Sequence, residues 1–535
     1  MAFYLWLLGV VWTSFAQADV EPYYASADYD KGEFGPWPLQ SYKSSSLVGP
    51  VVNYLFRAEE CNKDGKYTFI TPRGYSVPQA GPLILDKHGS LVWTKGYGPS
   101  YDFNVQRYKG ENYLTFWVGN DDLVGHGSGS YYMLDSSYKE AYKVSGANGK
   151  AADLHEFRII HENTAVLTLY NVLPANLSSM GGPENGYIWD SGFQELNIET
   201  GEAIFEWWAS AYFGYDEAYR GIEGEGEEKN TAWDYFHINS VDKDQDGNYL
   251  ISSRYMNCLT YINGTSGDII WKLGGKHNMF VDLSGGAATN ISWQHDARFQ
   301  KNDTAITLFD NASRGSDGFS VGDGTSEEYS SRGLYLDIDK TNLTVKVRYT
   351  YWNPRGITSI SQGSVQLLED DRVIVGYGIN AAWTEYTLDG QVLCDVHFGP
   401  ESGFGTKDIV SYRASRHAWV GKPKTLPDIA VHDHKIYVSW NGATEVADWV
   451  LEGAKTKMST AEYHVIVSQP KDGFETVILV PENPSYRFIR ARGLDRSGYF
   501  LGHTKVMAEN GPLEMKIGLY GATIIIQTVD TSDLS

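Results

Sequence analysis

The chain has 535 residues, and its formal net charge of −23 argues against a nucleic acid or an anionic membrane as partner, because both need concentrated lysine and arginine. Hydrophobic residues make up 42% of the chain and only three residues are cysteine, which excludes bulk disorder and a small disulfide-stapled scaffold. The 56 glycines and 37 tyrosines favour an all-β fold with many tight turns.

Residues 1–18 have the features of a secretory signal peptide. An apolar run from Phe3 to Phe15 ends in Ala16-Gln17-Ala18, a small-x-small cleavage pattern. The run is too short for a comfortable membrane span, and a buried strand or an uncleaved anchor is the alternative. We therefore expect a secreted protein with no membrane span beyond this segment.

Sequons and cysteines fit the same interpretation. Six N-x-S/T sequons predict glycosylation, and they begin at Asn176, Asn263, Asn290, Asn302, Asn311 and Asn342. The three cysteines are Cys61, Cys258 and Cys394. They allow at most one disulfide within the chain, and their spacing does not identify the pair.

A three-part pattern recurs along the chain at a spacing of roughly 50 to 75 residues. Each unit begins with a short β-rich element, at 102–106, 153–157, 235–239, 293–297 and 361–365. A second β-rich strand follows, at 113–118, 165–170, 249–254, 305–309 and 373–377. A hairpin completes the unit, at 133–144, 195–207, 261–273, 335–351 and 385–398, and one more copy lies at 84–93.

Each unit therefore supplies four strands, the content of a propeller blade. Five clear units and an N-terminal one predict a six-bladed β-propeller over residues 19–425, with stacked sandwiches as the alternative. Residues 426–510 instead show short strands, turns about ten residues apart and a candidate buried tryptophan, typical of a fibronectin-III or Ig-like β-sandwich. The tail, residues 511–535, is ambiguous between a further strand and a frayed end.

The first element of each unit would line the central channel of a propeller. Aligning these elements places five residues at one equivalent position: Asn104, His155, His237, His295 and Gln362. We expect the three imidazoles to meet in one funnel, where neutral imidazoles can bind a metal or act as nucleophile and general acid or base. Any one of these histidines alone would more often be structural.

Arg314 follows His295 by 19 residues, in a glycine-containing loop just after a predicted strand. A guanidinium at such a position suits a tetrahedral anion and would repel a divalent cation. We therefore expect an oxyanion site with no tightly bound metal and no cofactor. A solvated loop residue is the alternative for Arg314.

Four segments resemble the fungal branch of the arylsulfotransferase (ASST) family: 67–74, 236–241, 294–299 and 439–444. The resemblance covers nearly the whole mature chain. It implies a six-bladed propeller, as in bacterial members, that moves a sulfuryl group from a phenolic sulfate ester to another phenol through a sulfated histidine, without a nucleotide donor.

The resemblance also implies residue roles. The catalytic set would be His237, His295 and Arg314, which match the channel histidines and arginine of the family. From their equivalent positions in the aligned elements, we expect His155, Asn104 and Gln362 to contact the aryl sulfate or the phenol.

The sequence departs from the family at one position. The sulfate-carrying histidine belongs on the first strand of a late unit, where this chain has Gln362 and Gly363. Glutamine cannot form a sulfo-imidazole, so either His295 or His237 takes that role, or the reaction differs, or the site only binds. The rival functions are a non-catalytic propeller that binds an anionic or aromatic ligand, and a metal-dependent hydrolase or lyase that uses the channel histidines.

Overall fold

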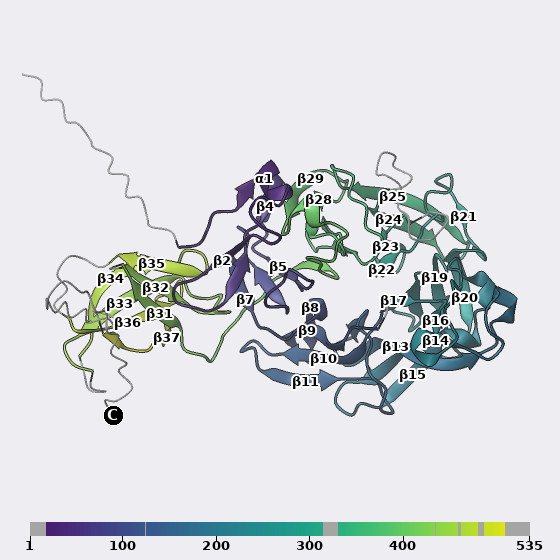
Figure 1. Ribbon diagram of the computed structural model, residues 1–535, viewed down its shortest axis with the longest axis horizontal. Helices are drawn as coiled ribbons and strands as arrows, with labels where there is room; N and C mark the ends of the chain where they lie inside the picture. Colours follow the sequence, from purple (N-terminus) through teal and green to yellow (C-terminus); the bar gives the residue numbers. More distant parts are fainter. Residues whose placement is uncertain are drawn as a thin grey trace, which may run out of the picture. The chain divides into compact units, whose positions relative to one another are not determined.

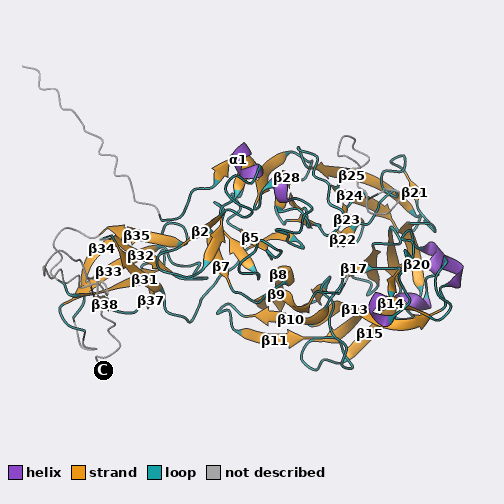
Figure 2. Ribbon diagram, in the orientation of Figure 1, coloured by secondary structure: helices purple, strands orange, loops and turns teal. Residues whose placement is uncertain are grey.

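The computed structural model describes residues 18–123, 125–313, 330–433, 435–457, 462–479 and 486–508. These residues are mainly in β-strands, as Figure 2 shows, so the all-β prediction is confirmed. The helical elements are α1 (Ala27–Asp30) and the short 3-10 turns Ser178–Met180, Ala209–Ala211, Tyr215–Glu217, Lys229–Thr231 and Glu401–Gly403.

The chain forms two compact units. The larger unit comprises residues 22–39 and 49–423. The smaller unit comprises the described parts of residues 1–21, 40–48 and 424–535. Its boundary with the larger unit at 423–424 lies close to the predicted boundary at 425–426.

The larger unit contains six sheets built on one plan (Figure 1). In each sheet four strands lie side by side, and each pairs antiparallel with the next. The first has β30 (Ala414–His417), β5 (Tyr67–Ile70), β6 (Leu83–Leu85) and β7 (Leu91–Thr94). The second has β8 (Ser100–Tyr108), β9 (Glu111–Asn120), β10 (Ser128–Leu134) and β11 (Glu140–Val144). The third has β12 (Phe157–Ile160), β13 (Thr164–Ala175), β14 (Gly186–Asn197) and β15 (Ala203–Trp208), with β16 (Trp233–Asp234) beside β14.

The other three sheets repeat the plan. The fourth has β17 (Ile238–Lys243), β18 (Tyr249–Ser253), β19 (Cys258–Ile262) and β20 (Ile269–Gly274). The fifth has β22 (His295–Gln300), β23 (Ala305–Asp310), β24 (Arg332–Asp339) and β25 (Thr344–Trp352), with β21 (Val281–Asp282) at its edge. The sixth has β26 (Ser364–Leu367), β27 (Arg372–Gly376), β28 (Ala382–Thr387) and β29 (Val392–His397).

The first strands of these six sheets meet at the middle of the unit. They contact one another in the cyclic order β8, β12, β17, β22, β26, β30 and again β8. Figure 1 shows the sheets arranged around this common centre. Residues near the starts of the first strands are therefore brought together from all parts of the chain.

The core lies between neighbouring sheets. One hydrophobic cluster joins Leu250 and Leu259 of the fourth sheet to Leu308 and Leu334 of the fifth. Because each sheet has neighbours on both faces, its middle strands are apolar on both sides, and every residue of β23 is buried. This explains why the middle strands appear as continuous apolar runs in the sequence.

Two early segments complete sheets that contain late ones. β30 pairs antiparallel with β5, with Ala414 opposite Ile70 and His417 opposite Tyr67. β4 (Asn53–Arg57) pairs with β29, and β1 (Tyr23–Tyr24) pairs with β4. The sequence analysis predicted neither pairing.

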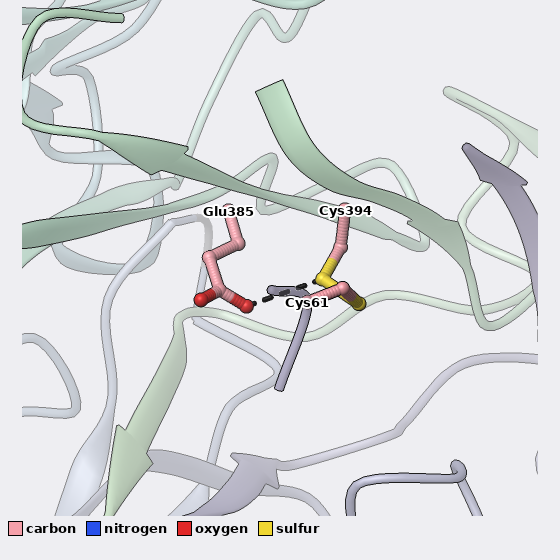
Figure 3. A group of neighbouring side chains, drawn as sticks. All are labelled: Cys61, Glu385 and Cys394. Carbon is pink, nitrogen blue, oxygen red and sulfur yellow. Dashed lines mark hydrogen bonds between the residues drawn. A yellow bond between two sulfur atoms is a disulfide. The ribbon is translucent and has the colours of Figure 1, made fainter. Parts of the chain in front are cut away.

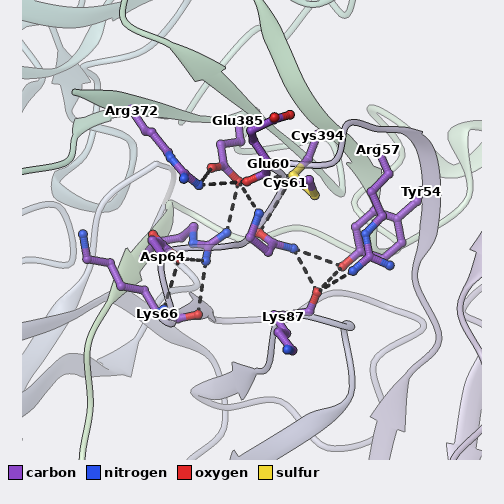
Figure 4. The surroundings of a disulfide bond; sticks show 12 residues. Tyr54, Arg57, Glu60, Cys61, Asp64, Lys66, Lys87, Arg372, Glu385 and Cys394 are labelled. Carbon is purple, nitrogen blue, oxygen red and sulfur yellow. Dashed lines mark hydrogen bonds and ion pairs between the residues drawn. A yellow bond between two sulfur atoms is a disulfide. The ribbon is translucent and has the colours of Figure 1, made fainter. Parts of the chain in front are cut away.

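A disulfide between Cys61 and Cys394, which are 333 residues apart, ties the same two parts of the chain together (Figure 3). The Oε2 atom of Glu385 lies 3.2 Å from Cys394 Sγ. Arg372 Nη1 donates to Glu385 Oε1 over 2.9 Å, which holds the carboxylate beside the disulfide (Figure 4). Cys258 is buried and has a free thiol.

The smaller unit contains two sheets that share one core. One sheet has β31 (Asp428–His432), β32 (Lys435–Ser439) and β35 (Glu475–Leu479). The other has β34 (His464–Pro470), β33 (Asp448–Ala454), β36 (Phe488–Leu494) and β37 (Phe500–His503), with β38 (Met507–Ala508) beside β36. Val438 and Ile478 of the first sheet pack in one cluster with Trp449 and Ile489 of the second. Trp449 is thus a buried core tryptophan of this unit.

Part of the N-terminal segment belongs to the smaller unit, although the sequence analysis assigned residues 19–425 to the propeller. Residues 40–48 belong to the smaller unit. They begin in β2 (Leu39–Ser41) and end in β3 (Val48–Pro50), two short strands that pair with each other. Glu475 accepts hydrogen bonds from the backbone N–H groups of Lys43 and Ser44, over 3.1 and 2.6 Å. Asp19 accepts one from the backbone N–H of Phe474 over 2.7 Å.

Three earlier predictions fall partly or wholly outside the described residues. These are the apolar run of the predicted signal peptide, the tail after residue 510 and Arg314. Within the part of the chain that the structure describes, no helix has the length and apolar character needed to cross a membrane.

Candidate functional site

The predicted channel residues lie at or near the starts of the central strands. His295 is the first residue of β22, and His237 directly precedes β17. His155 and Gln362 each lie two residues before a central strand, β12 and β26. The cyclic order of these strands brings the four residues toward one centre.

His155 and His237 form a pair of imidazoles in edge-to-face contact. Their ring centroids are 4.9 Å apart and their planes are 82° apart. His155 Nδ1 donates to Asp153 Oδ2 over 2.7 Å, and His237 Nδ1 donates to Asp234 Oδ2 over 2.5 Å. Because each carboxylate fixes the proton on Nδ1, each neutral ring keeps a lone pair on Nε2. Neither Nε2 atom has a hydrogen-bond partner among the described residues.

The backbone around His237 holds its ring in place. His237 has a φ of 56°, in the left-handed region that is uncommon for residues other than glycine. Its carbonyl accepts a hydrogen bond from the backbone N–H of Arg254 over 2.9 Å. Asp234, which orients the ring, is itself fixed in β16 by pairing with Trp189 of β14.

Burial and neighbouring charge set the protonation of the two pairs. Although burial by itself would raise it, interactions with His155 and His126 lower the pKa of Asp153 to about 2. Burial raises the pKa of Asp234. Burial and the neighbouring His155 together hold the pKa of His237 well below 6.5. His237 is therefore neutral at physiological pH, and Asp153 is ionised.

Tyrosine rings surround the histidine pair. The Tyr170 centroid lies 6.0 Å from those of both His155 and His237. Tyr255 lies 4.9 Å from His237, and Tyr412 lies 5.7 Å from His155. Aromatic walls with a few polar groups are typical of sites that bind an aryl ring.

His295 belongs to the same centre but both of its ring nitrogens are engaged. Its Nδ1 lies 2.9 Å from the carbonyl oxygen of Trp293 and 2.7 Å from Asn311 Oδ1, both acceptors. Its Nε2 accepts a hydrogen bond from the backbone N–H of Gln362 over 3.2 Å. The His295 ring lies 6.4 Å from that of Tyr412. No ring nitrogen of His295 is therefore free to act as a nucleophile in this arrangement.

The contacts of Asn311 also bear on the predicted glycosylation. Asn311 is fully buried, and its amide nitrogen donates to the carbonyl oxygens of Ser359 and Gln362. A glycan on this side chain is incompatible with the fold. Asn311 is therefore a structural residue of the site, although it begins a sequon.

Asn104 does not join the other predicted residues. A β-bulge lies between Tyr101 and Asn104 in β8, and Asp102 within it has a φ of 52°. After this shift in register, Asn104 lines a separate cavity of 260 Å³ together with Arg413. Tyr101 instead lies near the centre, with its ring 5.8 Å from that of Tyr412.

Buried arginines occur at several places in the larger unit. Six are buried: Arg73, Arg220, Arg254, Arg298, Arg413 and Arg416. Four of these form ion pairs with carboxylates, and the exceptions among the described residues are Arg73 and Arg254. Burying a cation without a counter-charge is costly, so both positions favour an anionic ligand.

Arg254 directly follows β18 and lies beside the histidine pair. Its guanidinium lies 4.0 Å from the centroid of the Trp293 ring. Nη1 donates to the Tyr255 hydroxyl over 2.9 Å, Nη2 donates to the Ile360 carbonyl over 2.8 Å, and Nε has no partner. Burial lowers the pKa of Arg254, as expected for a cation that lacks a paired carboxylate.

Residues 104–399, more than half of the chain, match the family model described as Arylsulfotransferase (ASST). The chain belongs to the arylsulfotransferase family. The matched segment contains His155, His237 and Arg254. Among curated proteins, no relative matches this family member.

Several solved structures resemble this arylsulfotransferase family member weakly. A protein of unknown function from Bacteroides caccae is 12% identical over 66% of this chain and 99% of its own, with a TM-score of 0.38. A Lactobacillus plantarum protein is 12% identical over 77% and 98%, with a TM-score of 0.33. Regucalcin, a calcium-binding protein from Agrobacterium tumefaciens, is 11% identical over 62% and 79%, with a TM-score of 0.28. These TM-scores are too low to support an argument from those structures.

Sequence analysis missed two side chains at the arylsulfotransferase centre. The sequence analysis places Arg254 at the end of the predicted strand 249–254, whereas in the structure it directly follows β18. Arg314 likewise comes after a predicted strand, and that position is the signal that could have identified Arg254. His126 lies in the loop between β9 and β10, outside the aligned elements, and its ring stacks 4.4 Å from Tyr170. Both ring nitrogens of His126 are buried without a partner, and burial lowers its pKa.

The metal-dependent rival needs ligand atoms that meet at one point. Within the described ranges, one group of at least three His, Cys, Asp or Glu residues is close enough to share an ion: Cys61, Glu385 and Cys394. Two of its ligand atoms are joined in the disulfide. Among the described residues, His155, His237 and His295 do not form such a group.

Proposed function

We propose that this protein is an aryl-sulfate sulfotransferase that moves a sulfuryl group from a phenolic sulfate ester to a phenol without a nucleotide donor. One observation carries the proposal: two histidines in edge-to-face contact, each oriented by a buried aspartate, lie beside a buried arginine that has no carboxylate partner among the described residues. On this proposal the six sheets are the blades of a β-propeller, and the smaller unit is a fibronectin-III-like sandwich.

His237 is the nucleophile. Its neutral ring keeps the Nε2 lone pair, which attacks the sulfur of the donor. The bond between sulfur and the phenolic oxygen breaks, and its electron pair stays on that oxygen. The products of this half-reaction are a free phenol and a sulfuryl group on His237 Nε2.

His155 is the general acid and base. In this role its Nε2 first takes up a proton from solvent, which the neighbouring carboxylate of Asp153 stabilises, and then donates it to the departing phenolate. In the second half-reaction the acceptor phenol returns a proton to His155 and its oxygen attacks sulfur, which breaks the N–S bond. The two rings are in direct contact, with centroids 4.9 Å apart, so the proposed nucleophile and general acid are neighbours.

Arg254 stabilises the negative charge on the sulfate oxygens. It is held by Tyr255 and Ile360 and has no carboxylate to neutralise it, so it is preorganised for an anion. The proposal thus differs from the roles that the family resemblance implied. His155 and Arg254 take catalytic parts, and His295 positions Gln362.

We also propose that the protein is secreted. The disulfide between Cys61 and Cys394 supports this, because such bonds persist in oxidising compartments. The apolar N-terminal run with its cleavage pattern supports it independently.

The proposal is tested by trapping the sulfated protein. The purified chain is mixed with radiolabelled 4-nitrophenyl sulfate, denatured rapidly and digested, and the labelled peptide is identified by mass spectrometry. We expect one sulfuryl group on His237, absent in His237→Gln and retained in His295→Gln. Label on another histidine would reassign the nucleophile, and saturable binding of the ester without label or turnover would favour a non-catalytic binding protein.

A further inference from the structure

In the part of the chain that the structure describes, Arg73 is the second buried arginine without a carboxylate partner. It lies on the loop after β5, and its side chain is only 7% exposed. Its guanidinium stacks over the ring of Tyr101 at 3.9 Å, an attractive cation–π contact. Nη1 is buried and has no partner. The charge and one donor of Arg73 are therefore available to a ligand.

Two contacts hold Arg73 rigidly. Its backbone N–H donates to the carbonyl of Val410 over 3.0 Å, and the Val410 N–H donates back over 2.9 Å. Its Nη2 donates to Gln362 Oε1 over 3.0 Å. Gln362 stands where the family resemblance places the sulfate-carrying histidine. In this chain the residue at that position holds the Arg73 guanidinium in place.

A chain of ring contacts links Arg73 to the histidine pair through Tyr101 and Tyr412. Tyr101, under the Arg73 guanidinium, has its ring 5.8 Å from Tyr412. Tyr412 in turn lies 5.7 Å from His155. An aryl ligand that spans this chain of contacts from the histidine pair would bring its far substituent to Arg73.

We propose that Arg73 binds a second anionic group, a carboxylate on the aryl ring, so that the preferred substrates are hydroxyaryl carboxylic acids and their sulfate esters. This inference rests on the proposed function for its reaction but not for its binding. Because one histidine carries the sulfuryl group between two phenols, donor and acceptor rings occupy the same place in turn. The preference for a carboxylate therefore applies to both.

Binding of phenol and of 4-hydroxybenzoate, measured by calorimetry at neutral pH without any sulfate donor, tests the inference. We expect the unaltered chain to bind 4-hydroxybenzoate at least tenfold more tightly than phenol. Arg73→Gln is expected to abolish this preference and Arg73→Lys to retain part of it. The matched control is Arg107→Gln on β8, whose side chain is 62% exposed and pairs with Glu162; it should keep the full preference.

Equal affinity for the two phenols in the unaltered chain, or an intact preference in folded Arg73→Gln, would overturn the inference. Thermal unfolding of each variant establishes that it is folded, and Arg73→Lys keeps the test decisive if Arg73→Gln does not fold. The two proposals fail separately. If the chain prefers 4-hydroxybenzoate through Arg73 but transfers no sulfuryl group, only the proposed function is contradicted. If it transfers the sulfuryl group but shows no such preference, only this inference is contradicted.

Discussion

The backbone N–H of Gln362 donates to Nε2 of His295, over 3.2 Å. This contact occupies the nitrogen that His295 would need in order to attack sulfur. The other ring nitrogen faces Asn311 and Trp293, so the ring links three segments of the centre. His295 is thus a positioning residue, whereas the Nε2 atoms of His155 and His237 have no hydrogen-bond partner among the described residues.

The roles of the histidines predict unequal effects of substitution. We expect His237→Gln to lower kcat/KM for transfer from 4-nitrophenyl sulfate to phenol by on the order of 10³-fold or more, because the nucleophile is removed. His295→Gln retains a side chain that can accept from the Gln362 N–H and should cost less than about tenfold. Steady-state rates check both variants, and equal losses would contradict the assignment.

Arg254→Gln should lower kcat by about 10² to 10³-fold, or about 3 to 4 kcal/mol, because the cation acts mainly on charge that develops in the transition state. Arg107→Gln, at an exposed ion pair, serves as the control and should leave kcat unchanged. A variant with unchanged kcat and a raised KM would show instead that Arg254 contributes only to ground-state binding.

The rate of sulfation should be independent of pH between 8 and 6. Burial holds the pKa of His237 well below 6.5, so the nucleophile stays neutral over this range. With 4-nitrophenyl sulfate the departing phenolate is stable and needs little help from a general acid. Stopped-flow release of nitrophenolate measures the step, and a rate that halves near pH 6.5 would place an ordinary imidazole in the attacking role.

Asp153 should make the free energy of unfolding depend on pH in the acidic range. Its pKa is lowered from 3.8 to about 2 on folding, so its contribution is present above pH 4 and is lost as pH falls through 2. The loss by pH 2 is about 2 kcal/mol. Urea unfolding at pH 5 and pH 2 should show this component in the unaltered chain and not in Asp153→Asn. The same pH dependence in both proteins would refute the assignment.

The disulfide should contribute substantially to stability, because it closes a loop of 333 residues. We expect the double variant Cys61→Ser, Cys394→Ser to lose about 2 to 5 kcal/mol of unfolding free energy. Guanidinium denaturation measures the change. A midpoint equal to that of the unaltered chain would mean that the pairing of β4 with β29 alone secures this part of the fold.

Local sequence patterns predicted the strands well. The second strand expected at 305–309 is β23 (Ala305–Asp310), and the one expected at 249–254 is β18 (Tyr249–Ser253). Hairpin turns and apolar runs are local signals, which explains this agreement. The pairing of β30 with β5 depends on residues far apart in sequence, and no local pattern encodes it.

The site was predicted only in part for the same kind of reason. Aligned strand starts correctly brought His155 toward His237, because strand order alone places them. The alignment misplaced Asn104, since a bulge of one residue changes which side of the strand a side chain faces. Asp234 and His126 lie outside the repeated pattern, so only the folded chain reveals that they meet the histidine pair.

The pairing of β30 with β5 has a consequence for biosynthesis. The first sheet lacks its central strand until the chain has reached residue 417. About 350 residues separate the two strands, and at about 5 to 20 residues per second their synthesis takes roughly 20 to 70 seconds. Throughout that interval β5 presents an unpaired edge, which is a template for association with other chains. The yield of this protein therefore depends on how well the cell shields a half-built sheet while translation is still under way.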